Sequence, residues 1–234
     1  LNSHLLRYDR STQLFEDNSN LGSIINNIDF ENTLSTIGTG FSFQLGGILK
    51  VTNEFRLGLT YDSPTWYTME EETTQYLYTN SDIDGPARVN PQIVNIYPSY
   101  RLQTPGKITG SLAYVFGDKG LLSFDYSLKD YGSAKFKPTS DSFFAVQNRV
   151  INNDLVAAST YRFGAEYRVN QCSFRGGYRF EESPYKNGVT VGDLSGYSFG
   201  IGFNLGNTKL DLTYDQANRS SQPQLYNVGL TDAA

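Results

Sequence analysis

The sequence predicts an all-β protein, an antiparallel transmembrane β-barrel. Three observations point to it: two-faced hairpins, strands of about ten residues, and alternating short and long connections. The clearest hairpin folds residues 160–169 onto 172–180 across a turn at Asn170 and Gln171. Side chains alternate with period two along a strand, so one face of this hairpin is aromatic and the other is charged. In an outer-membrane barrel the aromatic face contacts lipid and the charged face lines a hydrated lumen.

Three further hairpins repeat the pattern. They pair residues 41–49 with 55–61, 108–116 with 122–130, and 197–205 with 210–215. Their second face is rich in Gly, Ser, Thr and Asn, whereas a protein core is filled with Val, Ile and Leu. We therefore expect about nine strands, at residues 4–15, 37–50, 54–62, 107–116, 121–130, 159–169, 172–181, 195–205 and 208–215.

The lengths of the connections separate two fold classes. Short connections lie near residues 51–54, 117–121, 170–171 and 206–209, and they alternate with long ones at about 17–36, 62–107, 131–158 and 181–196. One rim of tight turns and one of long loops is the arrangement of outer-membrane barrels, with the periplasm at the tight turns. A soluble β-sandwich would explain the two-faced strands but not this asymmetry, so it is the less favoured class.

Composition agrees with a membrane barrel and excludes other classes. The 234 residues suffice for one large domain, and aromatic residues make up 14% of them. The mean hydropathy is -0.42, and no run approaches the 18 apolar residues of a transmembrane helix. The net charge is -5 without a basic stripe, so nucleic acid is not an expected partner. The lone Cys172 excludes an internal disulfide.

Three phrases of the sequence resemble the FadL/TodX family of outer-membrane transporters. They are GTGFSFQLGGILKVTNEFRLGLTYDSPTWY (38–67), LQTPGKITGSLAYVFGDKGLLSFDYSLKDYG (102–132) and TYRFGAEYRVNQCSFRGGYRFEESP (160–184). The resemblance implies a barrel of fourteen strands, of which this chain would supply roughly strands five to thirteen. Residues 1–234 would then form a single barrel domain, incomplete at both ends and without the family's N-terminal hatch.

The resemblance also implies a function. It is passive uptake of hydrophobic small molecules, such as long-chain fatty acids, through the outer membrane of a Gram-negative bacterium. The expected partners are outer-membrane lipid, lipopolysaccharide and the hydrophobic ligand. The alternative is a barrel subunit or scaffold of an outer-membrane secretion or surface-protein complex, which would bind other outer-membrane proteins.

Apolar side chains in two long connections are the candidate ligand-binding residues. Apolar residues outside a membrane can form a landing groove for a hydrophobic molecule, or they can pack the loops into a cap. The first connection supplies Trp66, Tyr67, Met69 and Tyr76, and the second supplies Phe143 and Phe144.

Charged residues on the inward face are the second candidate site. They form a luminal charge network of Arg56, Arg162, Glu166, Arg168, Arg175 and Arg179. Ion pairing within this network would keep the lumen polar, whereas one or two free arginines would steer a carboxylate ligand. The sequence leaves open which arginine would do so.

No catalytic or metal-binding pattern is present. Ser3 and His4 are neighbours in a predicted strand, so their side chains point to opposite faces and cannot act as nucleophile and base. No Gly-x-Ser-x-Gly, Cys-x-x-Cys or His-x-x-x-His spacing occurs. We therefore expect no enzymatic activity, no metal and no cofactor.

Overall fold

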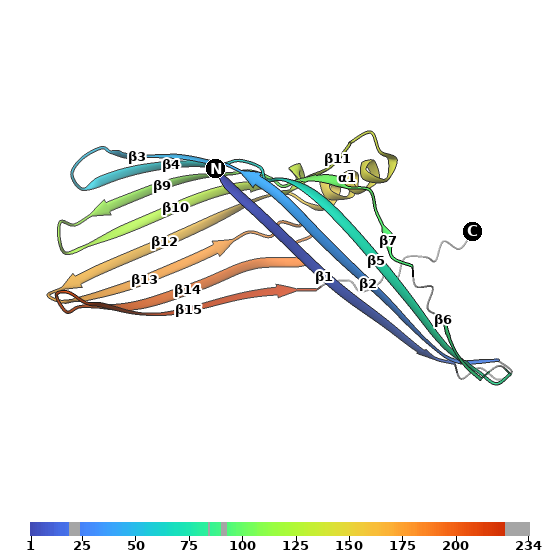
Figure 1. The fold of residues 1–234 in the computed structure, drawn as a ribbon. Helices are drawn as coiled ribbons and strands as arrows, with labels where there is room; N and C mark the ends of the chain where they lie inside the picture. Colours follow the sequence, from blue (N-terminus) through green and yellow to red (C-terminus); the bar gives the residue numbers. More distant parts are fainter. Residues whose placement is uncertain (19–23, 84, 90–92, 223–234) are drawn as a thin grey trace. The chain divides into compact units, whose positions relative to one another are not determined.

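The computed structural model describes residues 1–234 except 19–23, 84, 90–92 and 223–234, and these residues are mostly antiparallel β-strands (Figure 1). Backbone contacts divide the chain into two compact units. Unit 1 comprises residues 1–41 and 66–102, and unit 2 comprises residues 42–65 and 103–234. No helix in the described residues is long and apolar enough to cross a membrane.

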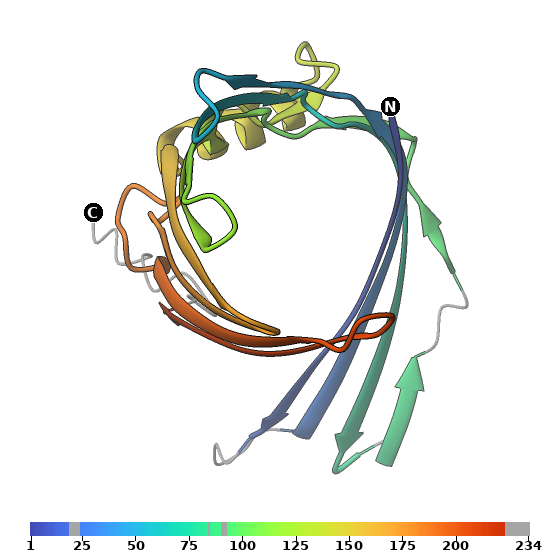
Figure 2. The same ribbon diagram turned by 90° about the vertical axis from the view of Figure 1, so that its left-hand side faces the viewer.

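Unit 2 contains an eight-stranded antiparallel sheet, with the strands in the order β15-β14-β13-β12-β10-β9-β4-β3. Figure 2 views this sheet from the end where four short hairpin turns lie, and it shows that the sheet curves strongly. The strands are β3 (Gln44–Lys50), β4 (Phe55–Asp62), β9 (Lys107–Val115), β10 (Gly120–Asp130), β12 (Ala157–Val169), β13 (Cys172–Glu181), β14 (Val191–Asn204) and β15 (Lys209–Ser221).

The register of this sheet confirms the predicted hairpins. In β12 and β13, Val169 pairs with Cys172 and Ala165 pairs with Gly176. Asn170 in the intervening turn has a positive φ of 51°, which asparagine tolerates better than most residues. Because these pairings hold along the whole hairpin, its aromatic and charged side chains lie on opposite faces, as predicted.

The aromatic face of unit 2 is exposed. Phe163, Tyr167 and Phe199 are 52%, 59% and 61% exposed. Among the described residues the only buried hydrophobic ones are Met69 and Ala158. A sheet of a water-soluble protein would cover such a face with a second layer, whereas a sheet in a bilayer covers it with lipid. The exposed rings therefore fit the barrel and not the β-sandwich.

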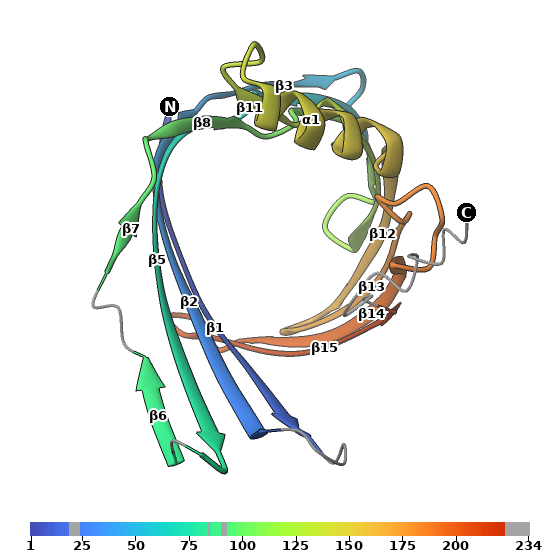
Figure 3. The ribbon, with the colours of Figure 1, turned by 90° about the vertical axis from the view of Figure 1, so that its right-hand side faces the viewer.

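The connection between β10 and β12 is structured. It contains the 3-10 turn η1 (Tyr131–Ser133), the short strand β11 (Lys135–Lys137) and the helix α1 (Ser142–Asp154). Figure 3 views the structure from the end opposite the hairpin turns of unit 2, and α1 lies at this end of the unit.

Unit 1 shows that the prediction of about nine strands is wrong, because the described residues of the chain form fifteen. In this unit β1, β2, β5 and β8 follow one another, and β6 and β7 pair with β5. The connections predicted near 17–36 and 62–107 are largely strand. The bounds are β1 (Asn2–Asp17), β2 (Ile25–Ser42), β5 (Trp66–Ser81), β6 (Gly85–Val89), β7 (Asn95–Ile96) and β8 (Tyr100–Gln103).

The polar composition of these strands explains why the alternation of aromatic and polar residues does not predict them. Thr33 of β2 lies opposite Thr74 of β5, and their hydroxyl groups hydrogen-bond across the pair. Further along the same pair, Ser35 lies opposite Glu72. Such strands are stabilised by the backbone ladder and polar cross-strand pairs, so they lack the aromatic alternation by which the other strands were predicted.

Candidate functional site

The charged face of unit 2 carries two separate clusters rather than one network. The first lies near the hairpin turns and is centred on Glu166, which accepts hydrogen bonds from Arg168 and Arg175. The Arg175 Nε atom is 3.0 Å from Glu166, and its Nη1 atom is 2.5 Å from Asp211 on β15. Two arginines therefore face two carboxylates, and the cluster is balanced.

A glycine makes this balance possible. Gly202 lies on β14, between Ser173 on β13 and Asp211 on β15. A Cβ atom at position 202 would lie 2.5 Å from the Ser173 hydroxyl and 2.6 Å from an Asp211 carboxylate oxygen. The absence of a side chain there leaves space for Arg175 to reach across β14 to its second partner.

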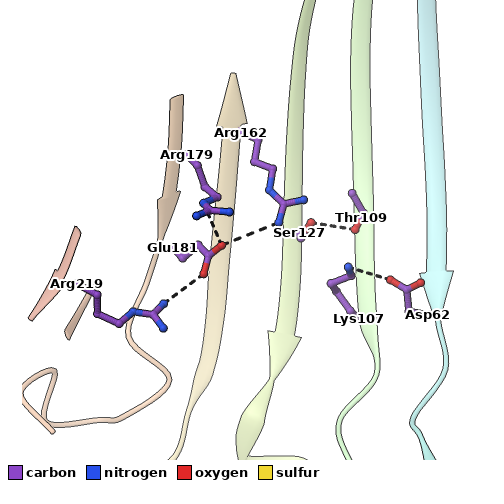
Figure 4. A network of polar contacts seen from close by, with 8 residues as sticks. All are labelled: Asp62, Lys107, Thr109, Ser127, Arg162, Arg179, Glu181 and Arg219. Carbon is purple, nitrogen blue, oxygen red and sulfur yellow. Dashed lines mark hydrogen bonds and ion pairs between the residues drawn. The ribbon is translucent and has the colours of Figure 1, made fainter. Parts of the chain in front are cut away.

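The second cluster lies near the long connections and has a different charge balance (Figure 4). Here the single carboxylate of Glu181 faces Arg162, Arg179 and Arg219 at 4.0, 3.6 and 3.2 Å. Arg162 and Arg179 are also direct cross-strand partners. Like charges in that position repel each other. Asp125 on β10 is the other cross-strand neighbour of Arg162, but among the described residues Glu181 is the one carboxylate within 4.0 Å of these guanidinium groups.

Hydrogen bonding separates the arginines of the two clusters. Arg168 and Arg175 donate to Glu166, whereas in the described part of the chain Arg219 alone donates to Glu181. Among the described residues, the guanidinium groups of Arg162 and Arg179 make no hydrogen bond, and these side chains are 49% and 37% exposed. Their donors are therefore available to an anion.

The strands beside this cluster extend the polar surface. Lys107 lies 3.1 Å from Asp62, and the Thr109 and Ser127 hydroxyl groups are 2.9 Å apart, as Figure 4 shows. At the adjoining η1 turn, burial and the charge of Glu181 raise the pKa of Tyr131, while Arg219 opposes the shift. Tyr131 is therefore a neutral hydroxyl group at neutral pH.

The structure divides the residues predicted as one luminal charge network. Glu166, Arg168 and Arg175 belong to the first cluster, and Arg162 and Arg179 belong to the second. Arg56 on β4 is in neither cluster, because Ala113 and Lys50 are its partners across the adjoining strands.

Glu181 and Arg219 are absent from the predicted inward-facing charges, although each has the inward parity of its strand, whereas the predicted strand 208–215 already places Asp211 on the inward face. Asp211 follows the alternation of β15, and Glu181 follows that of Arg175 and Arg179 on β13. Arg219 lies beyond the predicted end of its strand at residue 215, because β15 continues to Ser221. Alternation carried to the last residue of the predicted strand 172–181 would have included Glu181, and alternation carried to the observed end of β15 would have included Arg219.

The predicted ligand groove in the first long connection is not formed as expected. Trp66, Tyr67, Met69 and Tyr76 all belong to strand β5 and not to a loop. Their positions alternate, so Trp66 and Tyr76 lie on one face and Tyr67 and Met69 on the other. The polar stretch of β5 concealed the strand in the sequence.

Local packing in unit 1 accounts for these side chains. Trp66 packs on Phe41, with ring centroids 5.1 Å apart. Met69 is buried opposite Gly38, where an added Cβ atom would lie 2.6 Å from the Met69 sulfur. Trp66 and Met69 therefore pack against the neighbouring strand β2.

Phe143 and Phe144 lie side by side in the sequence but differ in surroundings. Phe144 stacks on Phe136, with ring centroids 5.8 Å apart and an interplanar angle of 15°. Phe143 is 65% exposed. Phe144 therefore packs the long connection, while Phe143 contacts Phe144 edge-on, with ring centroids 5.8 Å apart, and keeps most of its surface exposed.

Comparisons with known proteins bear on the fold. No family model matches the chain, and no curated protein matches it. Among solved structures it is similar to the "CymD monoaromatic hydrocarbon channel", with a TM-score of 0.51 and 12% sequence identity over 93% of this chain and 70% of that chain. At this identity the similarity concerns the fold. The predicted all-β fold class, an antiparallel transmembrane β-barrel, is confirmed, and the family resemblance noted from the sequence is supported at the level of the fold.

Proposed function

We propose that this protein is an outer-membrane channel of a Gram-negative bacterium for the passive uptake of hydrophobic small molecules. We propose further that its cargo is long-chain fatty acids and that it has no enzymatic activity. The proposal of a channel for hydrophobic molecules is supported by the fold, which is similar to that of a protein described as a monoaromatic hydrocarbon channel. The exposed aromatic face of unit 2 supports a location in a bilayer.

One observation carries the choice of a fatty acid. The second cluster holds two guanidinium groups, those of Arg162 and Arg179, without a hydrogen bond among the described residues. A guanidinium group presents donors in a planar fork that matches a carboxylate. A fatty-acid carboxylate would therefore compete with Glu181 for these arginines, while its chain contacts apolar parts of the channel.

The position of the cluster suits a steering role. It lies near the long connections, which face the cell exterior in outer-membrane barrels. The guanidinium groups there attract a carboxylate from a distance, and salt weakens this attraction. The half-exposed side chains allow weak and reversible binding, as passive transport requires.

The proposal is tested by comparing a fatty acid with its uncharged analogue. Binding of palmitic acid, methyl palmitate and an alkylbenzene to the purified full-length protein in detergent is measured by calorimetry. We expect palmitate to bind about 30-fold more tightly than its methyl ester, because a charged hydrogen bond contributes about 1.5–3 kcal/mol. The difference should narrow at high salt.

Different results would contradict the carboxylate selectivity and the channel. Equal affinities for palmitate and methyl palmitate would refute the carboxylate selectivity. An absence of saturable binding of palmitate and alkylbenzene, together with no flux of either into proteoliposomes, would refute the channel. The scaffold alternative predicts this second result, with stable co-purification of other outer-membrane proteins.

The Glu181→Gln variant probes the competition directly. Removing the carboxylate leaves Arg162, Arg179 and Arg219 without their shared partner, so we expect palmitate to bind about three- to tenfold more tightly. Stability should fall by no more than about 1 kcal/mol, since the ion pairs are partly exposed. Calorimetry and thermal unfolding measure the two effects, and an unchanged or weaker palmitate affinity would contradict the model.

A further inference from the structure

The helix α1 is held firmly at the end of unit 2 that lies away from the hairpin turns (Figures 1 and 3). Its N-cap is Asp141, whose side chain accepts hydrogen bonds from the backbone of Phe143 and Phe144. The Asn148 side chain then binds both the backbone N–H and the carbonyl of Phe136 on β11, at 2.7 and 2.9 Å. The orientation of the helix is therefore fixed.

The fixed helix turns an apolar stripe away from the protein. Phe143, Val146 and Val150 are 65%, 50% and 47% exposed. Residues at this spacing lie on one face of a helix. The packed side, which includes Phe144 and Asn148, is a different face. These three side chains are therefore open to an apolar partner that is not part of unit 2.

A basic cavity lies beside the same helix. It has a volume of about 720 Å³, and its cationic lining residues are Lys135, Arg149 and Lys186. Of the described residues that line the cavity, Asp130 is the one acidic residue. Among the described residues, Lys135 and Arg149 take part in no ion pair. The cavity therefore has a surplus of positive charge.

The third cation of the cavity is held in place by the helix end. The ammonium group of Lys186 donates to the carbonyl of Asn152 at 2.8 Å, and the backbone N–H of Lys186 donates to the carbonyl of Asp154 at 2.8 Å. These bonds satisfy carbonyl groups of the last helical turn, which lack intrahelical partners. They also fix the connection between β13 and β14 beside the cavity.

We propose that this cavity binds the phosphorylated headgroup of a membrane lipid, while the apolar stripe of α1 contacts acyl chains. A helix with an apolar face and a flanking basic face is the pattern of an element that lies in a membrane interface. Free phosphate would satisfy the cations but not the stripe, and a hydrocarbon would satisfy the stripe but not the cations. An anionic amphiphile satisfies both.

The test uses the purified full-length protein in detergent with bisphosphorylated lipid A as the probe. The double variant Lys135→Gln/Arg149→Gln should bind this lipid about 30-fold more weakly, because each of the two basic residues contributes about 1 kcal/mol near a membrane surface. The matched control is Lys50→Gln/Lys119→Gln, which removes the same charge near the hairpin turns. Its affinity for lipid A should equal that of the wild type.

Three results would overturn the proposal. They are an unchanged affinity in the Lys135/Arg149 variant, an equal loss in the control, and displacement of the lipid by inorganic phosphate at an equal concentration, which would indicate a site for the free anion. Palmitate binding is measured on the same variants and should not change. A loss of lipid A binding with unchanged palmitate binding therefore concerns the cavity beside α1 and not the proposed channel, since the two sites share no residue.

Discussion

Replacing both Arg162 and Arg179 with glutamine is expected to weaken palmitate binding by about 30-fold, which corresponds to about 2 kcal/mol. These two guanidinium groups make no hydrogen bond among the described residues, so their donors are available to a carboxylate. The affinity for methyl palmitate should remain within about twofold, because the ester has no charge to lose. Calorimetry on both ligands measures the difference.

The matched control removes the same charge from the same face of the sheet. In the Arg168→Gln/Arg175→Gln variant the lost groups already donate to Glu166 and Asp211. This variant should be less stable but should bind palmitate nearly as tightly as the wild type. An equal loss in both double variants would mean that overall charge, and not the free donors, determines affinity.

Replacing Gly120 with alanine is expected to destabilise the β9–β10 hairpin by about 2–4 kcal/mol. Gly120 begins β10 and pairs with Tyr167 on β12. A Cβ atom there would lie 2.1 Å from the carbonyl oxygen of Glu166 and 3.1 Å from its carbonyl carbon. Both are backbone atoms, so relief requires the strands to separate and the cross-strand hydrogen bonds to break.

The effect is measured as the shift in thermal unfolding and as the fraction of folded protein on unheated gels. The control is Gly110→Ala on the neighbouring strand β9, where an added Cβ atom meets nothing within 4 Å. This control should remain within about 0.5 kcal/mol of the wild type. Equal stability of the two variants would contradict the close approach at Gly120.

The regular part of the fold could be predicted because its signal is local. The β12–β13 hairpin has aromatic and charged residues in strict alternation, and its two-residue turn sets the register. A shift of one residue would place every aromatic ring on the charged face, so the pattern permits a single register. The same reasoning holds for the other hairpins of unit 2.

The long connections could not be predicted in this way. Strand β5 carries Thr, Glu and Tyr on both faces, so its apolar residues show no period of two. Helix α1 depends on the Asp141 cap and on the contact of Asn148 with β11. Both elements form because of contacts with residues distant in the sequence. Such contacts produce no local sequence pattern from which the element could be predicted.

The sequence by itself determined the strand alternation, and with it which side chains lie on the aromatic face and which on the charged face. Only the tertiary structure decided which arginines keep hydrogen-bond donors without an acceptor among the described residues. Arg175 reaches Asp211 across the space above Gly202, whereas Arg162 and Arg179 share Glu181 with Arg219. Parity along a strand places a charge on a face, but ion pairing depends on distances of a few ångströms across several strands. A guanidinium group is therefore a binding site or a structural contact according to neighbours brought beside it by folding.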